Sequence, residues 1–301
     1  MRLLVLLGTT LLLSLGSAGV AAAHSGGLAS EPYLPRVLAV DPPVPGLSVA
    51  VVEGGARLAL ANDTALPVEV LPAGPQRAEE PVVEPGGRGH WADPRVATEA
   101  ATWSVPLRVG DQQVTVRGET IVPPAPATAG WWALTAGLAL GTALVGAVSV
   151  RRRAVEAVVA VLGLGAVAAH LVHVLGSASV PVDLPYWPTV LGTAGIGIGA
   201  WVAALTGAVL TAVGTRWGLL LTGIGGAVLA LVTVSDTDSF ADAVLPYAWD
   251  PTLDRVATAV TVGVGVGLFL TGFAALRAMT PDTLPGTETQ PLPDPLPEET
   301  R

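Results

Sequence analysis

Two histidines three residues apart, His170 and His173, have the clearest chemical potential in this chain. They lie in a long apolar segment, where a spacing of three places both imidazoles on one helix face. Ionisable side chains inside a membrane span are costly and commonly functional. Neutral imidazole is a ligand for copper, zinc or haem iron, so the pair is a candidate metal or haem site. In the alternative interpretation, both rings only pack and bind neighbouring carbonyls or lipid headgroups.

A third candidate ligand, His24, depends on processing of the N-terminus. Arg2, the apolar stretch 3–15 and small residues ending at Ala23 predict a secretory signal peptide over residues 1–23. Cleavage there would give His24 a free α-amine beside its imidazole, and such nitrogen donors suit Cu(II). The alternatives are an uncleaved anchor and an unliganded terminus.

Acidic side chains are expected near the histidine pair. Asp183, Asp236 and Asp238 precede or follow apolar segments on the side where the pair lies, and we expect them at a similar depth. His90 has no nearby histidine in the sequence and is expected at the surface. Glu156 follows Arg151–Arg153 closely and is expected to pair with these arginines.

Several function classes are excluded or disfavoured. The sequence contains no G-x-S-x-G elbow, P-loop, H-E-x-x-H or dinucleotide fingerprint, so we expect no enzyme. It also contains no cysteine, which excludes disulfides, thiolate metal sites and cysteine nucleophiles. The formal net charge of −9 and the lack of a basic patch argue against nucleic-acid binding.

The elements that must position these residues are mostly apolar. The 301 residues are 51% hydrophobic and 13% charged, whereas soluble domains have about 25% charged residues. A helix needs roughly 20 apolar residues to cross a bilayer. Five segments meet this requirement, so we predict five transmembrane helices within residues 126–277: 131–150, 154–175, 189–213, 217–234 and 256–276.

The distribution of charge predicts the orientation of these helices. Arg151–Arg153, Arg216 and Arg277 fall at alternate ends, where the positive-inside rule places the cytoplasm. We therefore predict a plasma-membrane protein with its N-terminal domain outside and its C-terminus inside. Trp131 and Trp132 would anchor the first span at the headgroups. The outer loop 235–255 is expected to contain a short helix over 240–247.

Pairs of glycines four residues apart recur in the predicted spans. These pairs are Gly137/Gly141, Gly195/Gly199 and Gly263/Gly267. Small residues let helices approach closely in lipid. The pairs indicate either packing within one chain or a dimer face.

The segment 24–125 has a different, β-rich pattern. Strands are predicted over the short segments 36–40, 47–53, 56–62, 67–71, 102–109 and 112–122. Gly54-Gly55 and Gly110-Asp111 are typical of tight hairpin turns. The fold class predicted for this domain is an all-β, immunoglobulin-like sandwich. Residues 77–99 are expected to form a solvated connection, with an exposed binding loop as the alternative. Residues 278–301 are expected to form a disordered cytoplasmic tail.

This layout resembles a family of uncharacterised actinobacterial membrane proteins. The similar stretches are AVDPPVPGL at 39–47, RLALANDT at 57–64 and WSVPLRV at 103–109. Members of that family carry a W-H-D-H-R segment, and the corresponding run here is Trp91-Ala92-Asp93-Pro94-Arg95. The resemblance implies that a metal site formed by those two histidines is missing from this chain. The plan is also similar to that of copper-resistance membrane proteins, although such likeness is a weak guide to function.

Three hypotheses follow. The first is a non-enzymatic envelope protein whose exported domain binds a partner or ligand, in its sharpest version copper, with His24, His170 and His173 as ligands. The second is a structural or assembly factor without a bound ligand. The third, a small-solute transporter, has the least support because no carboxylate is expected deep in a span.

Overall fold

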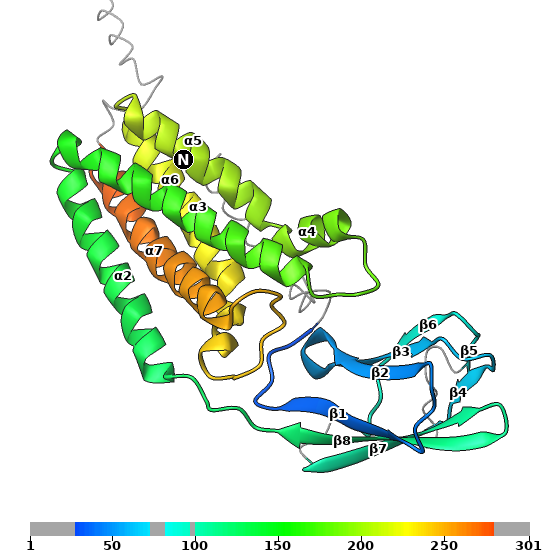
Figure 1. Ribbon diagram of the computed structural model, residues 1–301. Helices are drawn as coiled ribbons and strands as arrows, with labels where there is room; N and C mark the ends of the chain where they lie inside the picture. Colours follow the sequence, from blue (N-terminus) through cyan, green and yellow to red (C-terminus); the bar gives the residue numbers. More distant parts are fainter. Residues whose placement is uncertain (1–27, 73–81, 97–99, 280–301) are drawn as a thin grey trace, which may run out of the picture.

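The computed structural model describes residues 28–72, 82–96 and 100–279. Within them, a β domain is followed by a bundle of apolar helices, and the β domain lies against one end of the bundle (Figure 1). The predicted signal peptide, His24 and nearly all of the predicted tail lie outside the described residues.

The β domain consists of two antiparallel sheets. The five-stranded sheet has the order β1-β8-β7-β4-β5, and the three-stranded sheet has the order β2-β3-β6. The strands are β1 Leu34–Asp41, β2 Leu47–Val52, β3 Arg57–Asn62, β4 Val68–Val70, β5 Val82–Val83, β6 Arg88–Trp91, β7 Thr102–Val109 and β8 Gln112–Ile121. All six predicted strands are present. The glycine turns are confirmed as well, with φ of 66° at Gly54 and 56° at Gly110.

One core joins the two sheets. In β7, alternate residues from Trp103 to Val109 are buried, as period-two patterning requires. They pack with Val114 of β8 and with Leu58 and Leu60 of β3. Because side chains from both sheets contribute, burial of these apolar faces holds the domain together without a disulfide.

The expectation of a plain connection over 77–99 is wrong within its described part, residues 82–96, since β5 and β6 lie there. Trp91, the last residue of β6, is only 1% exposed and pairs in register with Leu58 of β3. These strands are two and four residues long. Their local alternation is too short to reveal a strand, and their pairing depends on a distant partner.

Four helical segments are long and apolar enough to cross a bilayer, and a bent pair raises the number to five if it counts as one span. The long helices are α2 Thr128–Ser149, α3 Glu156–Ala178, α6 Arg216–Thr233 and α7 Pro251–Arg277. The bent pair comprises α4 Tyr186–Ala194 and α5 Gly197–Ala212, whose axes differ by 69°. The third predicted span is therefore not a single helix. It breaks at Gly195, where φ is +42°, a conformation that side chains with a Cβ rarely adopt.

Helices α2 and α7 pack through reciprocal glycine and threonine contacts. A Cβ added to Gly146 would lie 1.8 Å from Thr271 Oγ1, and one added to Gly267 would lie 2.4 Å from Thr142 Cβ. Such close approach suits helices that associate by van der Waals packing. The interpretation of Gly263/Gly267 as an intrachain packing pair is confirmed, whereas a Cβ added to Gly137 would meet no neighbouring atom within 4 Å.

The same arrangement recurs between α5 and α6. A Cβ at Gly207 would lie 2.4 Å from Thr222 Oγ1, and one at Gly218 would lie 2.4 Å from Thr211 Oγ1. Two helix pairs thus use a glycine and a threonine four residues apart on each partner. This packing fixes α7 and α6, the central helices of the bundle.

The segment after α6 differs from its prediction. The short helix there is the 3-10 helix η3, Val234–Phe240, so it ends where the predicted helix over 240–247 was to begin. Phe240 is fully buried between Trp131 and Trp132, with ring-centroid distances of 6.0 and 5.4 Å. Burial of this ring fixes the end of η3, and the chain then continues without a regular helix to Asp250.

Candidate functional site

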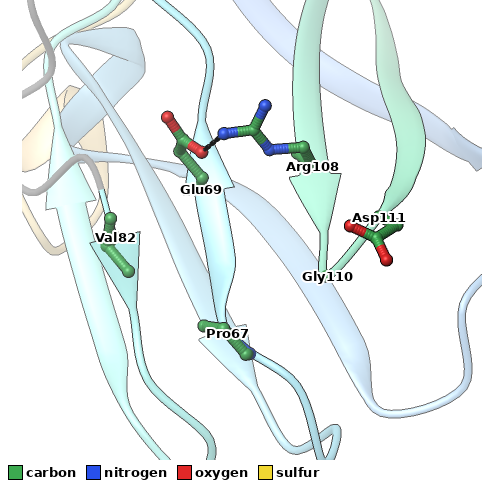
Figure 2. Close-up of a pocket in the computed structure, with 6 residues that line it drawn as sticks. All are labelled: Pro67, Glu69, Val82, Arg108, Gly110 and Asp111. Atoms are coloured by element: carbon green, nitrogen blue, oxygen red, sulfur yellow. Dashed lines mark hydrogen bonds and ion pairs between the residues drawn. The ribbon is translucent and has the colours of Figure 1, made fainter.

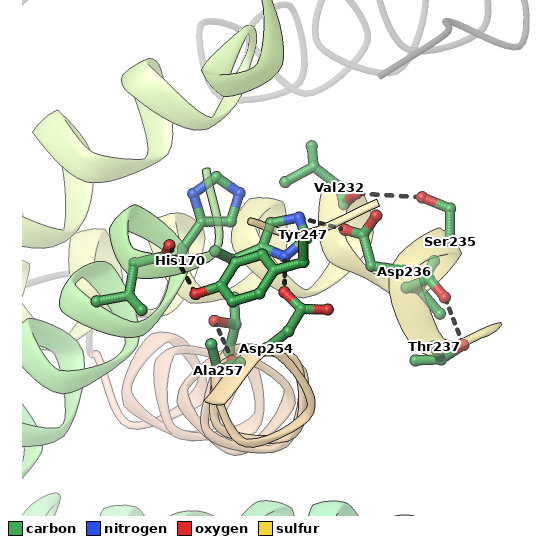
Figure 3. Close-up of polar contacts among 12 residues, drawn as sticks. His170, Val232, Ser235, Asp236, Thr237, Tyr247, Asp254 and Ala257 are labelled. Atoms are coloured by element: carbon green, nitrogen blue, oxygen red, sulfur yellow. Dashed lines mark hydrogen bonds and ion pairs between the residues drawn. The ribbon is translucent and has the colours of Figure 1, made fainter. Parts of the chain in front are cut away.

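His173 lies between two carboxylates at one end of the helical bundle. Its Nδ1 is 2.7 Å from Asp254 Oδ1, and its Nε2 is 3.5 Å from Asp236 Oδ2. Asp254 belongs to α7 and Asp236 to η3, and Figure 3 shows these two carboxylates approaching from different helices. His173 and Asp254 are both buried.

The local sequence explains how Asp254 reaches this position. Asp250 caps α7 by accepting from the Thr252 N–H at 2.6 Å, and Pro251 occupies the first turn. Helix α7 therefore starts early enough to carry Asp254 in its first turn. Hydrogen bonds from the backbone and side chain of Thr252 hold the pKa of the Asp250 carboxyl below its usual value.

The cluster has a defined chemistry. Carboxylates only accept hydrogen bonds, so an imidazole can donate to both of them only in its cationic form. The cation with two ionised carboxylates carries a net charge of −1. Such a group can hold or exchange a proton, and it can attract a cation.

His170 is engaged differently. Trp201 Nε1 donates to His170 Nδ1 at 3.1 Å. Because that nitrogen accepts, the single ring proton of His170 lies on Nε2. The ring also packs against the start of α5, where a Cβ at Gly197 would lie 2.7 Å from His170 Cε1. The centroids of the His170 and His173 rings are 6.3 Å apart, so the predicted shared helix face is observed.

Tyr247 packs against α3 next to the histidine cluster. Its ring packs on α3, where a Cβ at Gly176 would lie 2.0 Å from a ring carbon, and its hydroxyl donates to the Val172 carbonyl at 3.3 Å. Burial raises the pKa of the Tyr247 hydroxyl, and the charges of Asp254 and Asp250 raise it further. Tyr247 therefore remains a neutral donor at physiological pH.

The predicted metal site is not accompanied by a complete set of ligands in the described residues. Within the described ranges, no group of three or more histidine, cysteine, aspartate or glutamate side chains could hold a metal ion. Both ring nitrogens of His173 face carboxylates, and His170 offers no free lone pair while Trp201 donates to it. A metal or haem iron would have to displace these contacts. His24 is outside the described residues, so the three-histidine ligand set stays a prediction.

A second polar cluster holds the β domain to the loop between α3 and α4. Asp183 Oδ2 accepts from Arg57 Nη1 at 2.9 Å, and Asp183 Oδ1 lies 2.8 Å from His90 Nδ1. Glu53 Oε1 accepts from the Val182 N–H at 2.9 Å. Asp183, for which we expected a depth similar to that of the histidine pair, contacts the β domain. His90, expected as an isolated surface residue, is its partner.

The β domain also contacts the loop between η3 and α7. Glu31 and Val244 form an antiparallel bridge with two backbone hydrogen bonds of 2.9 Å. Ser30 Oγ donates to Asp242 Oδ2 at 2.6 Å. Arg255 braces this loop from α7, since its guanidinium donates to the carbonyls of Ser239 and Asp242. We call loops 179–185 and 241–250 together the β-domain seat.

The Trp91–Arg95 run forms a compact structural unit. Asp93 is buried and accepts from Trp91 Nε1 at 3.0 Å and from Arg95 Nε at 2.8 Å. Burial alone would raise the pKa of Asp93, but these hydrogen bonds and the Arg95 charge lower it below its usual value. The side chains of Ala92 and Pro94 are hydrocarbon and supply no ligand atom. The tryptophan, aspartate and arginine are thus explained by stability of the β domain.

An open pocket of about 480 Å³ lies on the five-stranded sheet (Figure 2). It is lined by Pro67, Glu69, Val82, Arg108, Gly110 and Asp111. Arg108 and Glu69 form an ion pair across it. Since its one cation is already paired, the pocket offers less chemistry than the buried histidine cluster.

Comparison with known proteins adds no assignment. The chain matches no protein-family model, and no curated protein or solved structure is significantly similar to it. The resemblance drawn from its short sequence patches therefore remains an expectation.

Two features of the site differ from the sequence interpretation. The contact between Asp254 and His173 was missed, although the Asp-Pro start of α7 could have placed Asp254 in a helix. Glu156 is buried, but among the described side chains it forms no ion pair with Arg151–Arg153.

Proposed function

We propose that this chain is a non-enzymatic integral protein of the plasma membrane that holds its β domain outside the cell, where the domain binds a partner or ligand. The β domain would be an immunoglobulin-like sandwich, supported by its two antiparallel sheets around one core. The helical region would cross the membrane five times, with α4 and α5 as the third crossing and the C-terminus in the cytoplasm.

The contact of the β domain with both parts of its seat carries this proposal. Five crossings place the start of α2 and the loops 179–185 and 241–250 on one side of the membrane. If α4 and α5 only dipped into the bilayer, four crossings would leave loop 241–250 on the opposite side. The bridge between Glu31 and Val244 supports five crossings, because it brings that loop to the β domain.

Charge supports the orientation. Arg151–Arg153 follow α2 and Arg277 ends α7. The C-terminal ends of both helices lie at the end of the bundle away from the β domain (Figure 1). The positive-inside rule assigns that end to the cytoplasm.

Accessibility of introduced cysteines tests the topology, because the chain has none of its own. In intact cells, a membrane-impermeant maleimide should label Gln113→Cys in the β domain and Ala241→Cys in the seat. It should label Ala154→Cys, between α2 and α3, only after permeabilisation. Labelling of Gln113→Cys without Ala241→Cys would contradict five crossings, and labelling of only Ala154→Cys would invert the orientation.

Metal handling, with copper as the leading ion, is the narrower form of this proposal. Residue chemistry supports it through His24, His170 and His173, while the engaged ring nitrogens favour the structural alternative. Metal analysis of purified protein, with His24→Ala and His170→Ala variants, separates the two. Stoichiometric metal that is lost in either variant would support handling. Its absence would support a structural or assembly role.

One observation favours the transport hypothesis more than the sequence did. The His173, Asp254 and Asp236 cluster supplies ionisable groups at the end of the apolar helices. Proton-linked solute flux in liposomes, abolished by Asp254→Asn, would support transport, whereas equal flux from empty liposomes would contradict it.

A further inference from the structure

Helix α4 has an apolar face that no described part of the chain covers. Trp187 and Leu191 are 68% and 61% exposed, and their spacing of four places them on one helix face. The opposite face, with Thr189 and Val190, is buried against α3. A helix facing water would expose polar residues instead, so the outward face of α4 suits lipid.

The direction of α4 distinguishes it from the spans. It is bent 69° from α5 and projects from the bundle next to the β domain (Figure 1). Helix α5 packs along α6 within the bundle. A helix inclined so strongly to a spanning neighbour runs close to the plane of the membrane. The 16 residues of α5 rise about 24 Å, whereas the hydrocarbon layer is roughly 30 Å thick. With its cytoplasmic end at the inner boundary, α5 therefore ends about 6 Å inside the outer boundary, and α4 continues from that depth.

The residues before α4 extend the same apolar surface. Val182 and Leu184 are 46% and 50% exposed, and Tyr186 stacks edge-on against Trp187. No charged residue occurs between Asp183 and Arg216. Aromatic residues beside aliphatic ones are typical of the headgroup boundary.

We propose that α4, with residues 184–185 before it, lies in the plane of the outer leaflet and inserts Trp187 and Leu191 among the lipids. This inference rests on the proposed membrane topology and names the lipid surface as the partner of α4. It also sets the height of the β domain. Asp183 is directly before this segment and binds Arg57 and His90, so the β domain would rest at the headgroup layer.

Spin-label depth measurements in phosphatidylcholine nanodiscs test this placement. Nitroxides are attached to Leu184→Cys, Trp187→Cys and Leu191→Cys, and their accessibility to oxygen and to a water-soluble nickel complex is measured. An in-plane helix should give high oxygen access, low nickel access and depths at 187 and 191 within about 2 Å. A helix along the membrane normal would separate these labels by about 6 Å, since each residue rises 1.5 Å.

Three outcomes overturn the inference: a 6 Å difference, strong nickel access at every position, or shielding from both reagents, as a second copy covering α4 would produce. Gly192→Cys repeats the measurement if Trp187→Cys fails to fold, because nothing lies within 4 Å of a Cβ there. Labels at Leu140→Cys and Leu144→Cys on the exposed face of α2 should report hydrocarbon depth. If those two labels are in water, the proposed topology fails, whatever α4 shows.

Discussion

His173 shows how strongly a single buried side chain can depend on its partner. We expect His173→Leu to lower the free energy of unfolding by about 3–5 kcal/mol, because the buried Asp254 carboxyl would lose its 2.7 Å partner and gain none in exchange. The double variant His173→Leu/Asp254→Leu should recover much of this loss. Thermal unfolding in detergent at neutral pH measures both. Equal losses in the single and double variants would show that the pair is not coupled.

Asp93 connects the stability of the β domain to pH. Its folded pKa lies below the ordinary aspartate value of 3.8, so its contribution is fully present above that pH and is lost as pH falls through the folded pKa. Asp93→Asn should remove about 1–3 kcal/mol at pH 7, because Arg95 and Trp91 lose a charged acceptor. Hydrogen exchange of β6 and β7 amides in the full chain measures this effect.

The matched control for Asp93 is Asp63→Asn, which removes an exposed ion pair with Arg88. Exposed pairs contribute about 0–1 kcal/mol, so exchange should change little. A control effect as large as that of Asp93→Asn would refute the special role of the buried carboxyl.

Residue-level prediction from the sequence succeeded where partners are local. Helical spacing predicted that His170 and His173 share a face. It could not predict that Asp254, 81 residues away, contacts His173, or that Trp201 donates to His170. Those contacts arise when α3 meets α7 and α5, and the packing of three helices is not encoded in any one of them.

At the scale of elements, reciprocal glycine and threonine contacts determine which helices pair. Gly146→Val should destabilise the α2–α7 pair by about 1–3 kcal/mol or more, because its Cβ would overlap Thr271. Gly137→Val, on the open side of the same helix, should be close to neutral. Thermal stability of the two variants in the same detergent gives the comparison. Similar losses for both would mean that helix propensity, rather than packing, dominates.

The elements themselves were mostly predictable. Alternating side chains identified β7 and β8, and apolar runs identified four long helices. The break between α4 and α5 was not found, because residues 189–213 are uniformly apolar and Gly195 resembles any packing glycine. The positive φ of Gly195 belongs to the folded chain, in which α4 packs on α3, and the local sequence does not specify it. Strands β5 and β6 were missed because their pairing partners lie elsewhere in the chain.

At the scale of the whole molecule, two loops hold the β domain on the bundle. Asp183→Ala removes the contacts to Arg57 and His90 without altering the β domain itself. We expect a broader distribution of distances between spin labels at Gln113→Cys and Ala241→Cys, measured by pulsed electron resonance. Arg117→Ala, which removes an ion pair with Asp41 on the surface of the β domain, is the control and should leave the distribution unchanged. An unchanged distribution in Asp183→Ala would mean that the bridge to Val244 suffices.

The bridge between Glu31 and Val244 has a consequence for how the protein is made. Ser30 and its partner Asp242 are 212 residues apart. At synthesis rates of about 5–20 residues per second, roughly 10–40 s separate their emergence from the ribosome. The β domain must therefore wait for a late part of the chain before its second attachment can form. Folding can finish only after loop 241–250 has been synthesised and α7 has entered the bundle. A chain terminated before that loop would leave the β domain held by loop 179–185 alone.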